Sequence, residues 1–334
     1  QAIGVDSSKI FFCMGNHDVD WRITRLIDAY STTNKYKNDD VELLKNFYQS
    51  CASSVSKDIL SYEEYKHLHP NYTATWEKPF SGVIEDDSCV FFVLNSSYMS
   101  SHDQELKHGV LSVEQLSWFS KQAVEYKSID KFKIVLLHHH PYAYQNLLPS
   151  LDPSILEESG ELSNICGNNG IELILHGHKH QPQAKTINQT GWLNPVTYIC
   201  AGSLSVNVSE RQQTIPNTLH FIDYHALHQI ELKNYSYTPE DGWFPTKYCA
   251  ATPVDDTMYL GKIPDINSVE KTIQNLPHNK SIEYDFLSSQ NDNIKYITRE
   301  ILSQLIKKMH PTCELYQKDF DSFIIFSYEE SNHE

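Results

Sequence analysis

The chain has 334 residues, 40% of them hydrophobic, which is enough for one large domain or two smaller ones with buried cores. Its 27 Lys and Arg residues against 43 Asp and Glu residues give a net charge of −16. That charge disfavours long nucleic acids as partners, because a polyanion is repelled by it. No run approaches the roughly 18–20 apolar residues of a membrane-spanning helix, so no membrane segment is predicted.

Seven cysteines are scattered along the chain without a C-x-x-C pair. Several of them lie inside apolar runs, where a thiol behaves as a small hydrophobic group. The odd number and the wide spacing predict free thiols rather than a disulfide framework. We therefore expect a cytoplasmic protein.

The first predicted strand covers residues 10–14 and ends at Gly15, where the polar residues Asn16, His17 and Asp18 follow. Apolar residues at helical spacing then predict a helical insertion at about 22–79. Two interpretations of this insertion remain open. It is either a surface elaboration or a cap that covers the site and contacts the substrate.

Strands are predicted from residue 80 onward. Segments 81–84 and 89–94 flank an acidic turn and predict a hairpin. Ser112 is the expected N-cap of the next helix, and Gln115 three residues later predicts a capping box. A turn is predicted at 167–170. The later single strands are predicted at 132–137, 171–175, 196–201 and 218–223, and a further antiparallel pair of strands at 228–232 and 235–237.

A loop-rich stretch at 242–257 places a predicted domain boundary near residue 250. The first domain then covers 1–249 and the second covers 250–334. Helices at 267–275 and 293–309 and a strand at 322–328 are predicted in the second domain. We identify no motif with recognisable chemistry there, so the function of 250–334 stays open.

Three apolar strands end in histidine-bearing turns. The strand at 10–14 leads into Gly15-Asn16-His17-Asp18, the strand at 133–137 leads into His138-His139-His140-Pro141, and the strand at 171–175 leads into His176-Gly177-His178-Lys179-His180. In open α/β sheets, ligands bind just beyond the carboxyl ends of the strands. The pattern therefore predicts one shared site.

The residue types of these turns suit metal and phosphate chemistry. His178 and His180, two residues apart in an extended segment after a glycine, can present two imidazoles to a borderline metal ion. Asn16 offers a carbonyl oxygen for a hard divalent ion. A histidine such as His17 can donate to a phosphate oxygen while Asp18 holds its other nitrogen; the alternative is a locally capped turn. Residues 138–140 are adjacent and cannot all face one point.

In this order the three motifs resemble the calcineurin-like metallophosphoesterase family, whose pattern is D-x-H, G-D-x-x, G-N-H-[DE], a strand-ending H often followed by x-P, and G-H-x-H. The resemblance covers roughly residues 9–235, and the H-x-P spacing favours His139 over its two neighbours. It implies an α/β fold. The expected architecture is a β-sandwich of two mixed sheets flanked by helices (α/β/β/α), lacking its first strands, with a small α+β C-terminal region.

The resemblance also implies roles for single residues. Asn16, His139 and His178 look like ligands of one metal, and His180 looks like a ligand of the other. His17 resembles the residue that stabilises or protonates the leaving group, and Asp18 the residue that orients it. The family holds two divalent ions (manganese, iron or zinc) bridged by a hydroxide that attacks phosphorus in a small phosphodiester or phosphomonoester.

The first two family motifs are not found ahead of Gly15, where Asp6 lies in the unrelated sequence Gly4-Val5-Asp6-Ser7. One metal site is therefore expected to be incomplete. We interpret the chain as an N-terminally truncated fragment with impaired hydrolase activity. The alternative is a non-catalytic scaffold on the same fold, with residues 250–334 available to a protein partner.

Overall fold

The computed structural model describes residues 13, 15, 81–97, 108–142, 155–204, 216–225, 229–246, 248–249, 252–253, 257–261, 264–297, 299–318 and 322–327. The helical insertion predicted at 22–79 lies outside the described residues, as does the predicted strand at 10–14 apart from Cys13. The chain divides into two compact units, one of residues 1–224 and 233–257 and the other of residues 225–232 and 258–334. The boundary placed at residue 250 from the sequence stays a prediction.

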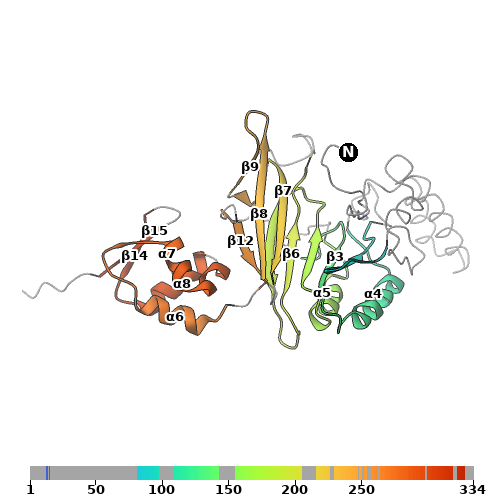
Figure 1. Ribbon diagram of the computed structural model, residues 1–334, viewed down its shortest axis with the longest axis horizontal. Helices are drawn as coiled ribbons and strands as arrows, with labels where there is room; N and C mark the ends of the chain where they lie inside the picture. Colours follow the sequence, from blue (N-terminus) through green and yellow to red (C-terminus); the bar gives the residue numbers. More distant parts are fainter. Residues whose placement is uncertain are drawn as a thin grey trace, which may run out of the picture. The chain divides into compact units, whose positions relative to one another are not determined.

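A six-stranded mixed sheet forms the centre of the first unit (Figure 1). Its strand order is β1-β2-β3-β4-β6-β5, in which β2, β3, β4 and β6 are parallel and the edge strands β1 and β5 are antiparallel to their neighbours. The strands are β1 (Gly82–Glu85), β2 (Cys89–Val93), β3 (Phe132–Leu136), β4 (Leu173–His176), β5 (Gln183–Ile187) and β6 (Val196–Cys200). The carboxyl ends of the parallel strands meet at one edge of the sheet, which is where ligands bind in such sheets.

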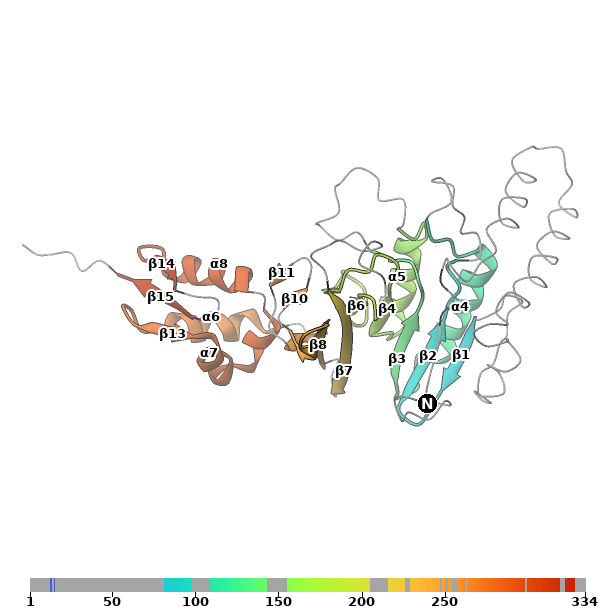
Figure 2. The ribbon, with the colours of Figure 1, turned by 90° about the horizontal axis from the view of Figure 1, so that it is seen from above.

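Both faces of this sheet are covered. Helices α4 (Val113–Glu125) and α5 (Ser159–Asn168) pack on one face (Figure 2), where the ring of Phe119 meets that of Phe92 edge-on at 5.5 Å between centroids. On the opposite face, Phe132 stacks on Tyr224 with centroids 3.7 Å apart. Burial on both faces explains why β2, β3 and β6 read as nearly continuous apolar runs instead of alternating ones.

The second sheet contains Tyr224. It has the order β12-β8-β7, and β9 also pairs with β8. Its strands are β7 (Asn217–His225), β8 (Gln229–Thr238), β9 (Gly242–Pro245) and β12 (Thr257–Leu260), and a separate two-stranded sheet joins β10 (Tyr248–Cys249) to β11 (Thr252–Pro253). The predicted pair of strands at 228–232 and 235–237 is wrong, because one strand covers both segments. Alternate residues from Ile230 to Ser236 are buried without interruption, so the chain has no reason to turn between them.

The turn predicted at 167–170 is partly wrong. Helix α5 continues through Gly167 to Asn168. A Cβ atom at Gly167 would lie 2.1 Å from the Trp192 ring, so glycine is required here for packing and not for a turn. The actual turn falls at 169–170, where Gly170 has a φ of 75°.

The second unit has its own apolar core and a three-stranded sheet of order β13-β15-β14. Its elements are α6 (Ile266–Gln274), β13 (Ser281–Glu283), α7 (Tyr284–Gln290), the 3₁₀ helix η6 (Asp292–Tyr296), α8 (Arg299–Met309), β14 (Glu314–Gln317) and β15 (Ser322–Phe326). The single helix predicted at 293–309 is wrong. Ile297 has an extended backbone and is buried in this core, so it separates η6 from α8. No helix among the described residues is long and apolar enough to cross a membrane.

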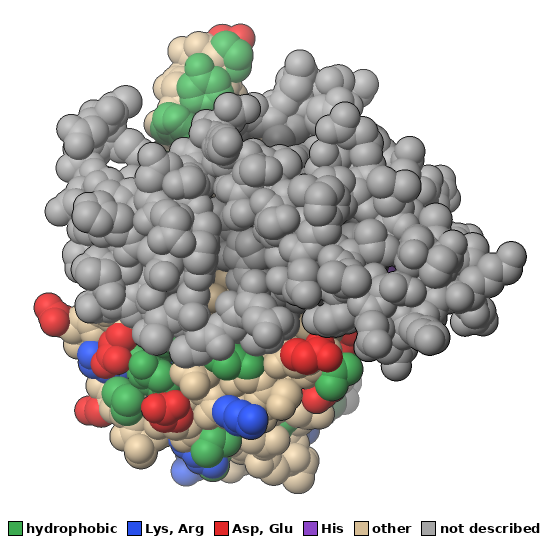
Figure 3. Space-filling model, turned by 90° about the vertical axis from the view of Figure 1, so that its right-hand side faces the viewer, with side chains coloured by type: hydrophobic (Ala, Val, Ile, Leu, Met, Phe, Trp, Pro, Cys, Tyr) green, Lys and Arg blue, Asp and Glu red, His purple; other side chains and the backbone are tan. Residues whose placement is uncertain are grey.

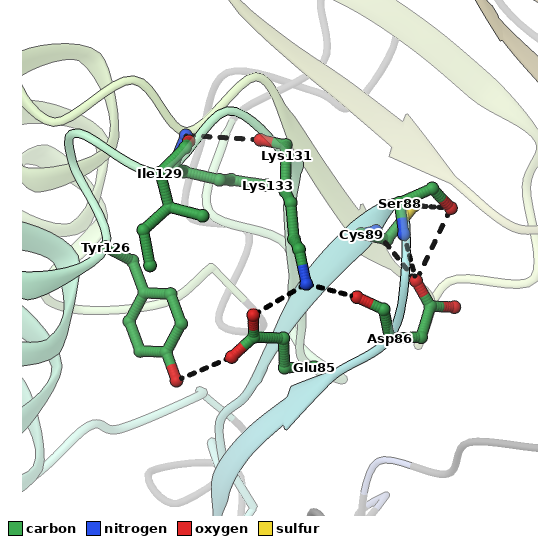
Figure 4. A network of polar contacts seen from close by, with 8 residues as sticks. All are labelled: Glu85, Asp86, Ser88, Cys89, Tyr126, Ile129, Lys131 and Lys133. Atoms are coloured by element: carbon green, nitrogen blue, oxygen red, sulfur yellow. Dashed lines mark hydrogen bonds and ion pairs between the residues drawn. The ribbon is translucent and has the colours of Figure 1, made fainter.

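A network of polar contacts holds the hairpin between β1 and β2 (Figure 4). The Asp86 carboxylate accepts the N–H groups of Ser88 at 2.9 Å and Cys89 at 2.7 Å. The Lys131 ammonium contacts the Glu85 carboxylate and the Asp86 carbonyl oxygen, both at 2.6 Å. These residues lie where β2 and β3 begin, at the end of the sheet away from the predicted site. We therefore assign them a structural role.

A histidine in β7 whose two ring nitrogens are buried should make the stability of the fold depend on pH. Neither ring nitrogen of His220 has a hydrogen-bond partner among the described residues, and burial lowers its pKa from 6.5 to about 4. Between these two values the unfolded chain binds a proton that the folded chain excludes. Lowering the pH from 7 to 4.5 should therefore remove about 2–3 kcal/mol of unfolding free energy through this residue alone.

Urea denaturation at both pH values measures this effect. His220→Leu should lose about 2–3 kcal/mol less than the wild type on acidification. The control is His225→Leu, since His225 lies on the same strand with 55% of its side chain exposed. Equal acid sensitivity of His220→Leu and the wild type would show that His220 is not the residue responsible.

Candidate metal centre

Two histidine-bearing loops meet at the carboxyl edge of the first sheet. β3 and β4 pair in parallel with Leu136 opposite Leu175. Beyond the strands, the N–H of Leu137 donates to Leu175 at 3.1 Å, and the N–H of Gly177 donates to the carbonyl oxygen of His138 at 2.9 Å. The pairing thus continues past the strand ends and places residues 138–139 beside residues 177–178.

His138, His139 and His178 form what we call the histidine cluster. One ring nitrogen from each lies within 4.8 Å of one from each of the others. His138 Nε2 is 2.9 Å from His178 Nδ1, and the rings of His139 and His178 are 4.5 Å apart between centroids. Three imidazoles at this spacing provide a donor set for one metal ion.

The orientation of His139 fits metal binding. Its backbone N–H donates to Ser96 Oγ at 3.1 Å, and its Nδ1 lies 3.0 Å from the same oxygen. Its Nε2 is buried and has no hydrogen-bond partner among the described residues. When Nδ1–H donates to the Ser96 hydroxyl, Nε2 carries the free lone pair, which is the arrangement typical of metal-binding histidines.

Electrostatics also favour the metal-binding form of His139. Burial, and then the neighbouring imidazoles of His138 and His178, lower the pKa of His139 far below its usual value. The ring is therefore neutral at physiological pH, and a neutral imidazole is the form that coordinates a metal. The three imidazoles of the cluster suit zinc or iron, whereas manganese, which prefers oxygen ligands, would need oxygen donors in addition to them.

Ser96 is itself fixed by the start of α4. Gln115 accepts the N–H of Asn95 at 2.8 Å and donates to its carbonyl oxygen at 3.1 Å. Ser112 is the N-cap, as predicted, and accepts from the Gln115 N–H at 3.3 Å. The predicted capping box does not form, because the Gln115 side chain is buried and binds Asn95 and Ser81 instead.

Gly109 allows the close approach of a second segment to His139. A Cβ atom on Gly109 would lie 2.4 Å from His139 Cβ and 2.5 Å from its Cγ. Contacts below 3.0 Å do not occur for real Cβ atoms, so a larger residue would displace the ring. The N–H of the next residue, Val110, donates to the Ser96 carbonyl oxygen at 3.0 Å and holds this segment in place.

The loop after β4 has an unusual backbone. His178 and His180 have φ angles of 75° and 54°, in the left-handed region that residues other than glycine rarely adopt. The extended segment expected from the spacing of these residues is therefore not what forms. Each such residue costs on the order of 1–3 kcal/mol, and backbone strain of this kind concentrates at functional sites.

The predicted site residues fall into three groups. His139 and His178 are brought together, whereas His180 is not a member of the cluster formed by the described residues. Asn16, His17 and Asp18 lie outside the described residues. The H-x-P spacing favoured His139 and did not select His138, which is nevertheless a member of the cluster. Its position directly after an apolar strand, next to a second histidine, could have indicated this. The roles of all these residues as ligands stay predictions.

The lining of a cavity of about 450 Å³ contains none of the three cluster histidines. The cavity is lined by residues that include Tyr142, Lys185, Trp192 and Tyr198. Lys185 donates to the Tyr142 hydroxyl at 2.6 Å and lies over the Tyr142 ring. This cavity is a separate feature and contributes nothing to the metal donor set.

Comparison with known proteins identifies a family. The calcineurin-like phosphoesterase family model matches residues 3–182, a segment that includes the whole histidine cluster. Purple acid phosphatase PPD1 from yellow lupin (Lupinus luteus) seeds is a structural match with 13% identity and a TM-score of 0.36, covering 56% of this chain and 34% of its own. A putative 5'-nucleotidase from Staphylococcus aureus, in complex with alpha-ketoglutarate, matches with 12% identity and a TM-score of 0.29, covering 81% of this chain and 44% of its own. The chain thus spans less than half the length of either protein. No curated protein matches it significantly in sequence.

Proposed function

Because the chain belongs to the calcineurin-like phosphoesterase family, we propose that it hydrolyses a small phosphodiester or phosphomonoester with the help of bound divalent metal. The family is metal-dependent and acts on phosphoesters. The observation that carries the proposal is the histidine cluster. The buried Nε2 of His139 has no hydrogen-bond partner among the described residues, and one ring nitrogen of His139 lies within 4.8 Å of one ring nitrogen each of His138 and His178.

Each described residue of the site has a defined task in this proposal. His138, His139 and His178 hold the ion, and Ser96 keeps His139 in the tautomer that exposes Nε2. A bound ion supplies charge neutralisation at the phosphate and lowers the pKa of a bound water. Buried Leu137 and the strained His178 turn fix the cluster at the sheet edge.

The remaining roles stay predictions. We propose Asn16 as a further ligand of the first ion and His180 as a ligand of a second one. We propose His17 as the donor to the leaving group and Asp18 as the carboxylate that orients it. The impaired activity expected from the two missing motifs also stays a prediction.

The charge of the chain bears on the class of substrate. The net charge is −16, and in the coloured part of the face shown in Figure 3 the Lys and Arg side chains lie among Asp and Glu side chains. A long nucleic acid is repelled by a strongly negative protein. The net charge supports a small phosphoester as the substrate.

Hydrolysis of p-nitrophenyl phosphate and of bis-p-nitrophenyl phosphate tests the proposed reaction. We expect weak release of p-nitrophenol in the presence of Mn²⁺, Fe²⁺ or Zn²⁺, in keeping with the impaired activity predicted for this chain, and loss of that release after chelation. The ester that is hydrolysed faster identifies the substrate class. Release that is unaffected by chelation would contradict the proposal. Absence of release from both esters with every metal would favour the alternative of a non-catalytic scaffold.

A further inference from the structure

A second cluster of metal-binding side chains lies in the second unit, outside the segment that matches the family. His278 follows α6, His310 follows α8, and Cys313 precedes β14. One ligand atom from each lies within 4.8 Å of one from each of the others. His278 Nε2 is 3.2 Å from His310 Nδ1, and Cys313 Sγ is 4.0 Å from His278 Nδ1.

The backbone around His310 and Cys313 is held by hydrogen bonds to regular structure. The N–H of His310 donates to Ile306 in α8 at 2.9 Å, and the N–H of Cys313 donates to the His310 carbonyl oxygen at 3.1 Å. The first bond extends the helix to His310, and the second closes the turn that returns Cys313 toward it. The spacing H-x-x-C at 310–313 is thus a folded arrangement.

His278 is fixed to the sheet through its neighbour Asn279. Asn279 has a φ of 57°, and its N–H donates to Ile325 in β15 at 2.8 Å. Its side-chain oxygen accepts the N–H of Ser327 at 3.2 Å. The anchored residue Asn279 therefore fixes the backbone directly after His278 beside β15.

The hydrogen bonds of His310 select the tautomer needed for metal binding. Its Nε2 lies 2.9 Å from the carbonyl oxygen of Ile273. A carbonyl oxygen can only accept, so Nε2 carries the hydrogen, and in the neutral ring Nδ1 has the free lone pair. A histidine that donates one N–H to a backbone carbonyl and turns its other nitrogen toward the ion is the usual form of a metal ligand.

We propose that His278, His310 and Cys313 form a Zn²⁺ site, distinct from the histidine cluster. Two ligand nitrogens on a tetrahedral zinc ion lie about 3.3 Å apart for Zn–N bonds of about 2.0–2.1 Å. His278 Nε2 and His310 Nδ1 are 3.2 Å apart, joined by a hydrogen bond whose hydrogen is on His278 Nε2, and zinc would take the place of that hydrogen between the two nitrogens. A thiolate with two imidazoles favours zinc over magnesium, calcium or manganese, which prefer oxygen ligands. The exposed position of His278 gives the ion access, and three protein ligands leave the fourth position to water.

Cobalt substitution tests this site separately from the proposed hydrolase centre. A cobalt ion bound to a cysteine thiolate shows a charge-transfer absorption that a cobalt ion bound by nitrogen and oxygen ligands lacks. Titration of the full chain with Co²⁺ should produce this absorption in the wild type and in His139→Ala. It should be lost in Cys313→Ser and strongly reduced in His278→Ala, and added Zn²⁺ should abolish it in the wild type.

The matched control is Cys89→Ser, since Cys89 is a free, half-buried cysteine of β2 in the other unit. It should keep the absorption. After dialysis against dilute zinc, the wild type should retain about one more zinc ion per chain than His278→Ala, a variant of an exposed side chain that leaves the core intact. Unchanged absorption in Cys313→Ser, or a wild type without the absorption at saturating cobalt, would overturn the proposal.

Discussion

His139→Ala is expected to lower kcat/KM for phosphoester hydrolysis at least about 100-fold, because it removes the imidazole that Ser96 orients toward the metal. Loss of even a supporting partner of a metal ligand typically costs 10–100-fold, so loss of the ligand itself should cost no less. The affinity for Mn²⁺, measured by equilibrium dialysis, should fall in parallel. Activity and metal binding should be lost together because they depend on one nitrogen.

Two further variants make this result specific. His225→Ala removes an exposed histidine of β7 and should keep both activity and metal affinity. His178→Ala, in which the altered side chain is only half-buried, should reproduce the loss if His139→Ala folds poorly. Unchanged kcat/KM in folded His139→Ala and His178→Ala would show that the histidine cluster takes no part in the reaction.

Gly109→Ala is expected to weaken metal binding about 10–100-fold without removing any ligand, because the added methyl group displaces the His139 ring. The new Cβ would meet two His139 carbon atoms at 2.4 and 2.5 Å, and crowding of this kind costs about 1–3 kcal/mol of unfolding free energy. Titration with Mn²⁺ measures the first effect, and urea denaturation measures the second.

Gly160→Ala is the matched control. Gly160 lies in the first turn of α5, and no described atom outside its immediate neighbourhood lies within 4 Å of its would-be Cβ. Alanine there should preserve metal affinity and raise the unfolding free energy by about 0.5–1 kcal/mol, because alanine favours a helix over glycine. If Gly109→Ala binds Mn²⁺ as tightly as Gly160→Ala, the close contact between Gly109 and the His139 side chain does not control the position of the His139 ring.

The sequence predicted five strands of the first sheet because their signals are local, but it did not predict the edge strand β5 (Gln183–Ile187). The apolar runs at 132–137 and 171–175 correspond to β3 and β4, and the acidic turn at 85–88 marks the observed hairpin. The predicted α/β fold with two mixed sheets agrees with the family shown by residues 3–182. Parallel pairing then brings His139 and His178 together, as their places after two strands predicted.

The sequence did not predict features that depend on contacts between distant segments. The capping-box pattern at Ser112 is local, but Gln115 binds Asn95, twenty residues earlier. The local sequence at 167–170 predicted a turn at Gly167. Glycine is required there because of the contact with Trp192, which lies on a distant segment that no local pattern connects to Gly167.

The cluster in the second unit was missed for the same reason. His278 and His310 are separated by a strand, two α-helices and a 3₁₀ helix, so no motif spacing could join them. His138 is a different case. Its pairing with His178 follows from the register of β3 and β4, which the H-x-P pattern does not contain.

The most direct test of the metal centre is the anomalous difference density of crystals grown with Mn²⁺. A peak should lie within coordination distance of ring nitrogens of His138, His139 and His178, and it should disappear in His139→Ala. Crystals of a protein with manganese-dependent activity that show no peak among these three residues would contradict the assignment of the histidine cluster as the metal centre.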